Sequence, residues 1–186
     1  MKLRFLATLA LSVLLAGCGS GPSLPSYGLV PDFDLTDQNG QPFHSQERLH
    51  GRVWVANLIF TSCVGPCPRM SAQMRQIRDA TRNAKGRSLV TLTIDPARDT
   101  PPVLAAYAKR FDAGPSWYFL TGPMKTLDHL AFDVLHLGHI DGTLEHSTRF
   151  VLIDRESRIR GYYDSSDAES IKELIRDLNA LDGAAN

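Results

Sequence analysis

Apolar residues recur along this chain with two different spacings, and the alternation between the spacings predicts its secondary structure. Unbroken apolar, β-prone runs predict three strands, at residues 52–60, 89–94 and 117–120. After the first run, a stripe of residues three or four positions apart predicts a helix from about Pro68. Thr100 as N-cap with proline in the first turn predicts a second helix, and we expect a third at 123–135. The strand at 52–60 is apolar on both faces apart from Asn57, which is typical of the buried centre of a sheet.

Shorter alternating runs predict a β-hairpin at each end of this core. The first lies within residues 32–43 around Asn39-Gly40, and the second joins 150–154 to 159–163. A last helix follows, with Ser166 and Glu169 as a capping box and a buried face of Ile171, Leu174, Ile175, Leu178 and Leu181. The order β-α-β-α-β-α-β-β-α predicts an α/β, thioredoxin-like fold with an N-terminal β-hairpin and a C-terminal hairpin plus helix.

The first residues are typical of an export signal. Lys2 and Arg4 precede a short apolar stretch at 5–16, and Leu15 to Cys18 is similar to a bacterial lipobox, in which Cys18 would be lipidated. A plain secretory signal cleaved nearby is the alternative. We therefore expect a lipoprotein signal peptide at 1–17, a lipidated cysteine and flexible tether at 18–31, and one folded domain at 32–186.

The charge and the cysteine content limit the classes of partner and the cellular location that we expect. The chain of 186 residues has 20 basic and 20 acidic side chains, so no overall field favours nucleic acid. Using Cys18 for lipid leaves two of the three cysteines, Cys63 and Cys67, as the only thiols of the mature domain. The predicted location is periplasmic or extracytoplasmic, where disulfides persist, with the domain held on the membrane through its lipid anchor.

Cys63 and Cys67 come directly after the first predicted core strand. In a regular helix, residues i and i+4 have Cβ atoms about 5–6 Å apart, wider than a disulfide requires. Gly65 and Pro66 between them predict a loop that becomes helical only near Cys67. Such a pair can close into a disulfide or bind one soft metal ion, and the nearby helix N-terminus is expected to lower the thiol pKa.

His146 begins the apolar run of the second hairpin and is the candidate third ligand. Two thiolates and one imidazole suit three-coordinate Cu(I), whereas zinc would require a fourth ligand. His136 and His139 could be auxiliary ligands, although histidines at such positions are more often solvated loop residues. We expect His44, His50 and His129 on the surface, Met70 and Met74 in the core, and Asp95 and Asp99 as caps.

Four segments, in order, resemble the Sco/SenC family of copper-binding cytochrome c oxidase assembly proteins. Residues 60–68 (FTSCVGPCP) are similar to the family's FTxCPxxCP signature, and residues 93–101 (TIDPARDTP) to its DPxxDTP block. Residues 117–122 (WYFLTG) and 146–154 (HSTRFVLID) resemble its WxFLTG strand and the segment with its metal-binding histidine. The resemblance extends over residues 33–178 and departs at Val64 and Gly65, since the family usually has proline after the first cysteine.

The resemblance implies a non-enzymatic metallochaperone with copper as its metal, Cu(I) and possibly Cu(II). Its ligands would be Cys63, Cys67 and His146, with Asp95 in metal transfer or partner contact. The implied partners are the copper-receiving subunit of a respiratory oxidase and a copper donor chaperone, which favours the inner membrane. The alternative is a thiol-disulfide oxidoreductase that reduces the target's cysteines through a redox-active Cys63–Cys67 pair. CxxC is the usual redox spacing, so the additional residue favours metal, and the position of Thr61 does not match a peroxidase.

Overall fold

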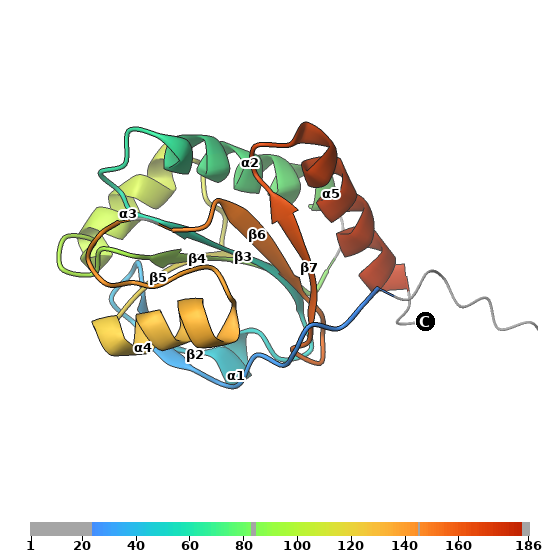
Figure 1. The fold of residues 1–186 in the computed structure, drawn as a ribbon, viewed down its shortest axis with the longest axis horizontal. Helices are drawn as coiled ribbons and strands as arrows, with labels where there is room; N and C mark the ends of the chain where they lie inside the picture. Colours follow the sequence, from blue (N-terminus) through green and yellow to red (C-terminus); the bar gives the residue numbers. More distant parts are fainter. Residues whose placement is uncertain (1–23, 83–84, 145, 184–186) are drawn as a thin grey trace, which may run out of the picture.

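The computed structural model describes residues 24–82, 85–144 and 146–183. Its seven strands form one sheet in the order β2-β1-β5-β4-β3-β6-β7 (Figure 1). Their bounds are β1 Asp34–Asp37, β2 Pro42–His44, β3 Val53–Ile59, β4 Arg87–Thr93, β5 Trp117–Thr121, β6 Arg149–Ile153 and β7 Ile159–Asp164. Both predicted hairpins are present, because β1 pairs antiparallel with β2 and β6 with β7. The thioredoxin-like α/β fold is confirmed.

Helices cover both faces of the sheet. Their bounds are α1 Ser45–Arg48, α2 Pro66–Thr81, α3 Pro101–Arg110, α4 Met124–Asp128 and α5 Ala168–Gly183. Figure 1 shows α2, α3 and α5 above the sheet and α1 and α4 below it. Each face has its own apolar cluster, one around Met70 and Met74 of α2 and the other around Leu127 of α4. The two methionines are fully buried, as predicted.

β3 is the centre of the sheet, and all seven of its residues are buried. It pairs parallel with β4 and antiparallel with β6. Asn57, the polar residue in this strand, accepts a 2.8 Å hydrogen bond from the hydroxyl of Thr91 on β4. The indole N–H of Trp117 on β5 in turn donates to the Thr91 hydroxyl, at 2.9 Å. A buried polar chain therefore links the three parallel strands and helps to fix their register.

Three helix predictions need correction. α2 begins at Pro66, two residues earlier than expected, because proline suits the first turn of a helix. The predicted third helix is α4 followed by a π-helical segment, η1 (His129–Val134). The proposed capping box of α5 is wrong, since the Asp167 carboxylate accepts from the Glu169 N–H while the Ser166 hydroxyl donates to Asp164.

Residues 24–31, the described part of the predicted flexible tether at 18–31, lie against the folded domain. Tyr27 donates a backbone hydrogen bond to Ile159, and Ile159 donates back to Gly28, both at 2.9 Å. Arg160 also binds the carbonyls of Leu24 and Pro25. The segment thus lies along β7, the last strand of the sheet, because an edge strand offers unpaired backbone groups. The proposed signal peptide and Cys18 lie outside the described residues.

Across the described residues, the search for a helix of sufficient length and hydrophobicity to span a bilayer finds none.

Candidate functional site

Strand order explains why Cys63, Cys67 and His146 come together. The two cysteines follow the carboxyl end of β3, with Cys63 in the loop and Cys67 in the first turn of α2. β6 runs antiparallel beside β3, with Ala56 opposite Val151. The start of β6 therefore lies beside the end of β3, and His146, three residues before β6, reaches the cysteine loop. The structure brings all three predicted ligands to one edge of the sheet.

The imidazole of His146 is oriented towards Cys67. Its Nε2 atom lies 3.9 Å from the Cys67 sulfur, although 79 residues separate the two in sequence. Its Nδ1 atom lies 2.8 Å from the carbonyl oxygen of Ser147, to which only a protonated nitrogen can donate. Burial also lowers the pKa of His146, which favours the neutral ring. The lone pair is therefore on Nε2, the nitrogen that faces the sulfur.

The two thiols are free and differ in exposure. Cys63 is partly exposed, whereas Cys67 is fully buried. Burial, and secondarily the neighbouring Cys63 thiol, raises the pKa of Cys67 to about 12. The expected lowering by the helix N-terminus is therefore wrong for Cys67, because loss of solvation outweighs the partial charge of the helix end.

Cys63 and His146 line an open depression of about 550 Å³ on the surface. Its other walls are apolar or small and come from the cysteine loop and from the segment before His146: Phe60, Ser62, Val64, Gly65, Pro66 and Leu144. The ring of Phe60 meets His146 edge to face, with centroids 6.2 Å apart. The side chain of Val64 is fully exposed beside Cys63. A molecule that reaches the Cys63 sulfur must therefore contact an apolar rim.

Asp99 fixes the beginning of the cysteine loop. Its buried carboxylate accepts hydrogen bonds from the hydroxyl groups of Thr61 and Thr93, each at 2.5 Å, and from the backbone N–H of Thr61 at 3.1 Å. It therefore joins the loop after β3 to the end of β4. The sequence predicted Asp99 only as a helix or turn cap. The position of Asp99 in the DPxxDTP block was the one indication of a further role in holding other segments in place.

The other candidates lie away from this depression. Asp95 is buried, and its carboxylate lies 3.3 Å from the Arg98 guanidinium, so its expected role in transfer stays a prediction. His139 stacks on Phe132 and contacts Asp128, while His136 contacts the Phe132 carbonyl. Among the described residues, neither histidine belongs to a group of three side chains that could hold a metal ion.

Within the described ranges, no three His, Cys, Asp or Glu side chains are already placed to hold a metal ion. Thiolates bound to one ion at about 2.3 Å lie roughly 4 Å apart, so the 3.9 Å between Cys67 and His146 is close to a ligating separation. Cys63, the remaining candidate donor, is on the loop and is partly exposed.

Comparison with known proteins gives consistent matches. The SCO1/SenC family model matches residues 23–181. A proposed copper-binding protein of Stutzerimonas stutzeri is 34% identical over 148 residues, covering 75% of this chain and 71% of the relative. A SCO1/SenC family lipoprotein of Bacillus anthracis has a crystal structure that superposes with a TM-score of 0.74 at 29% identity, covering 82% of this chain and 94% of that one.

A structure of BsSco, described as a member of the Sco family of cytochrome c oxidase assembly proteins with a disulfide switch, has the same fold. Its TM-score is 0.74 at 23% identity, with 86% of this chain and 96% of that chain covered. The family model covers the described fold except for its last two residues and includes all three candidate ligands. This chain belongs to the SCO1/SenC family.

Proposed function

We propose that this protein is an extracytoplasmic, membrane-tethered copper chaperone that delivers copper to the binuclear copper site of cytochrome c oxidase. The observation that carries the proposal is the 3.9 Å approach of His146 Nε2 to the Cys67 sulfur, with Cys63 at the rim of the same depression. Two sulfurs and one imidazole are soft donors suited to Cu(I). Membership of the SCO1/SenC family and the copper-binding relative support the same cargo.

Copper capture requires little rearrangement in this proposal. Cys67 is held by the first turn of α2 and His146 by its bond to the Ser147 carbonyl, so these two donors are preorganised. Cys63 reaches the ion from the loop and completes the site. Cys67 is buried, so its thiol proton must leave as the Cu–S bond forms.

The order in which the donors would release copper depends on how firmly the fold holds each of them. A receiving protein can approach only from the open side, where Cys63, His146 and Val64 are accessible. The His146 imidazole lies outside a regular element and is expected to leave the ion first, because the α2 backbone holds Cys67. Transfer would then proceed by stepwise replacement of His146 and Cys63 with donors of the receiving oxidase subunit.

The membrane part of the proposal rests on the sequence. Lipidation at Cys18 would hold the domain at the outer face of the inner membrane, within reach of a respiratory oxidase and of a copper donor chaperone. Metabolic labelling with a fatty acid tests this step. Label that enters the wild type and is lost in Cys18→Ser supports it, while equal labelling of both would contradict it.

Copper titration tests the proposed site. The full chain carrying Cys18→Ser, reduced and without oxygen, should bind one Cu(I) tightly in competition with a chromogenic chelator. Cys63→Ser, Cys67→Ser and His146→Ala should each lower the affinity at least tenfold, whereas His139→Ala, an exposed histidine outside the depression, should leave it unchanged. Equal affinity in all variants would overturn the proposal.

A thiol-disulfide oxidoreductase is the second candidate, and the unequal exposure of the thiols favours it. The partly exposed Cys63 thiolate would attack a disulfide of the target, and Cys67 would then attack the Cys63 sulfur of the mixed disulfide and release the reduced target. The target gains two electrons and two protons, and Cys63 and Cys67 become a disulfide. Rapid reduction of an oxidised copper-site peptide with weak copper binding would favour this reaction, whereas tight equimolar copper uptake with slow exchange favours the chaperone.

A further inference from the structure

A second cavity lies at the other end of α2 from the cysteines. Its volume is about 190 Å³, room for about six water molecules. The end of α2, the start of β4, the loop at residues 114–117 and Leu178 of α5 form its walls. Leu89 and Trp117 are buried and make part of the wall apolar. Because α2 has 16 residues, its two ends are about 24 Å apart, so this cavity is separate from the cysteine–histidine site.

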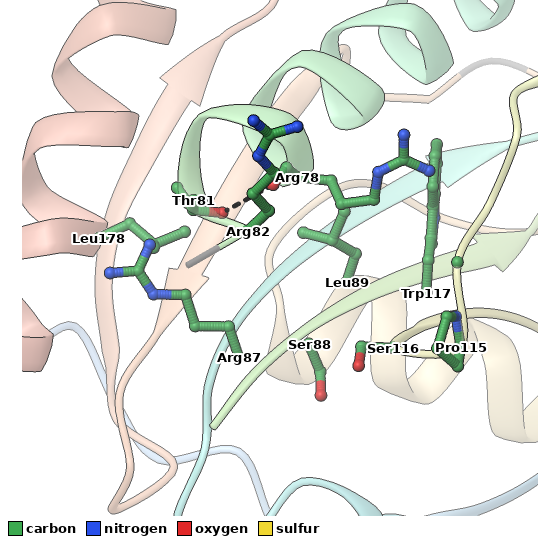
Figure 2. Close-up of a pocket in the computed structure, with 11 residues that line it drawn as sticks. Arg78, Thr81, Arg82, Arg87, Ser88, Leu89, Pro115, Ser116, Trp117 and Leu178 are labelled. Carbon is green, nitrogen blue, oxygen red and sulfur yellow. Dashed lines mark hydrogen bonds between the residues drawn. The ribbon is translucent and has the colours of Figure 1, made fainter. Parts of the chain in front are cut away.

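Three guanidinium groups surround this cavity, which we call the arginine pocket. They belong to Arg78 and Arg82 at the end of α2 and to Arg87 at the start of β4, and Figure 2 shows the first two above Leu89 and Arg87 on the side of Leu178. Positive charge is concentrated in this part of the sequence. Residues 75–87 contain five basic side chains and one acidic one, although the chain as a whole has no net charge.

The three arginines differ in how firmly other residues hold them. Arg78 contacts the carboxylates of Asp79 and Asp112 and the backbone carbonyl of Asp112, so it is held in place. Arg87 donates to the side-chain oxygen of Asn179 at 3.0 Å and is not free of other contacts, so it is held as well. In the described part of the chain, Arg82 makes no hydrogen bond or ion pair and is exposed. The pocket therefore has fixed guanidinium groups and one that is available to a ligand.

We propose that the arginine pocket binds a phosphate-bearing ligand, either a small phosphate ester or the head group of an anionic phospholipid. Guanidinium groups present paired N–H donors that match phosphate oxygens, and several around one cavity select an anion. The cavity is too small for a nucleotide-sized ligand but sufficient for a phosphate with a short polyol, whose carbon atoms would contact Leu89 and Trp117. This inference does not depend on copper binding.

The test uses the full chain carrying Cys18→Ser, so that no acyl chain is attached. Glycerol 3-phosphate is titrated while the backbone amide signals of Gly114, Ser116, Trp117 and residues 87–89 are followed by NMR, with glycerol as the neutral comparison. In parallel, the protein is sedimented with phosphatidylcholine vesicles that contain or lack phosphatidylglycerol. Arg82→Gln is the test variant, and Arg75→Gln removes the same charge from an exposed position of the same helix outside the pocket.

We expect saturable shifts with the parent protein. Arg82→Gln should weaken the affinity for the probe about tenfold, whereas the affinity of Arg75→Gln should stay within twofold of that of the parent. A response to glycerol 3-phosphate alone identifies a soluble ester. Sedimentation that depends on phosphatidylglycerol and on Arg82 identifies a lipid head group. The proposal is overturned if neither probe binds, or if Arg75→Gln weakens binding as much as Arg82→Gln, since general charge attraction would then explain the result.

Discussion

The carboxylate of Asp99 accepts a 2.5 Å hydrogen bond from the hydroxyl of Thr61, which lies 38 residues earlier in the chain. A second bond of the same length comes from Thr93, and the carboxylate is buried. The entrance of the cysteine loop is therefore fixed to the end of β4. The position of Cys63 depends on a residue that does not contact it.

Replacement of Asp99 with asparagine should loosen this loop. The amide nitrogen of asparagine is a donor and would face a threonine donor, so at least one buried hydrogen bond is lost. We expect Asp99→Asn to lower the free energy of unfolding by about 2 kcal/mol, measured by urea denaturation. Asp95→Asn is the matched control, since the Asp95 carboxylate contacts an exposed arginine and should contribute less. Equal stability of Asp99→Asn and the parent would contradict the role given to Asp99.

The two thiols should react at different rates. Cys63 is partly exposed and Cys67 fully buried, so alkylation of the native, reduced Cys18→Ser chain should modify Cys63 first. Mass spectrometry of peptides after brief iodoacetamide treatment measures the order, and denaturant should abolish the difference. Faster modification of Cys67 in the native protein would contradict the described arrangement.

Val64 should matter for transfer and not for stability. Its side chain is fully exposed on the rim beside Cys63, so Val64→Glu is expected to change the free energy of unfolding by less than about 0.5 kcal/mol. Copper affinity should be retained, because Val64 contributes no donor. Copper transfer to the receiving oxidase domain, followed by stopped-flow absorbance, should slow several-fold because a charge disrupts an apolar contact. An unchanged rate would show that the partner does not dock on this rim.

Arg160 should hold the early segment of the chain against the sheet. It pairs with the buried Asp154 at 2.7 Å and donates to the carbonyls of Leu24 and Pro25. We expect Arg160→Met to destabilise the protein by about 2 kcal/mol and to expose residues 24–31 to proteolysis. Arg158→Met, which removes an exposed arginine from the same hairpin, is the control. Protease resistance equal to that of the parent would contradict the docking of this segment.

The sequence predicted the main elements because their apolar patterns are strong. The fully buried strand β3 and the helix with Met70 and Met74 were found at nearly their true positions. The π-helical turn after Asp128 and the N-cap at Asp167 were missed, because local hydrogen bonding decides them and periodicity does not report it. Composition also cannot show that residues 24–31 pair with an edge strand.

The candidate ligands were predicted, but their environments were not. A motif and its spacing identified Cys63, Cys67 and His146, and the antiparallel pairing of β6 with β3 explains their convergence. The raised pKa of Cys67 follows from burial in the folded core, which one residue's position in a motif does not reveal. The hydrogen bonds of Asp99 with Thr61 and Thr93 form because β3 and β4 are neighbours in the sheet, which the sequence around Asp99 does not show.

X-ray absorption of the Cu(I)-loaded protein at the copper edge tests the central claim most directly. The account predicts a shell of two sulfurs and one imidazole nitrogen, with the nitrogen scattering lost in His146→Ala and one sulfur lost in Cys63→Ser or Cys67→Ser. A shell that keeps its imidazole nitrogen in His146→Ala, or that contains no sulfur, would contradict the proposed site.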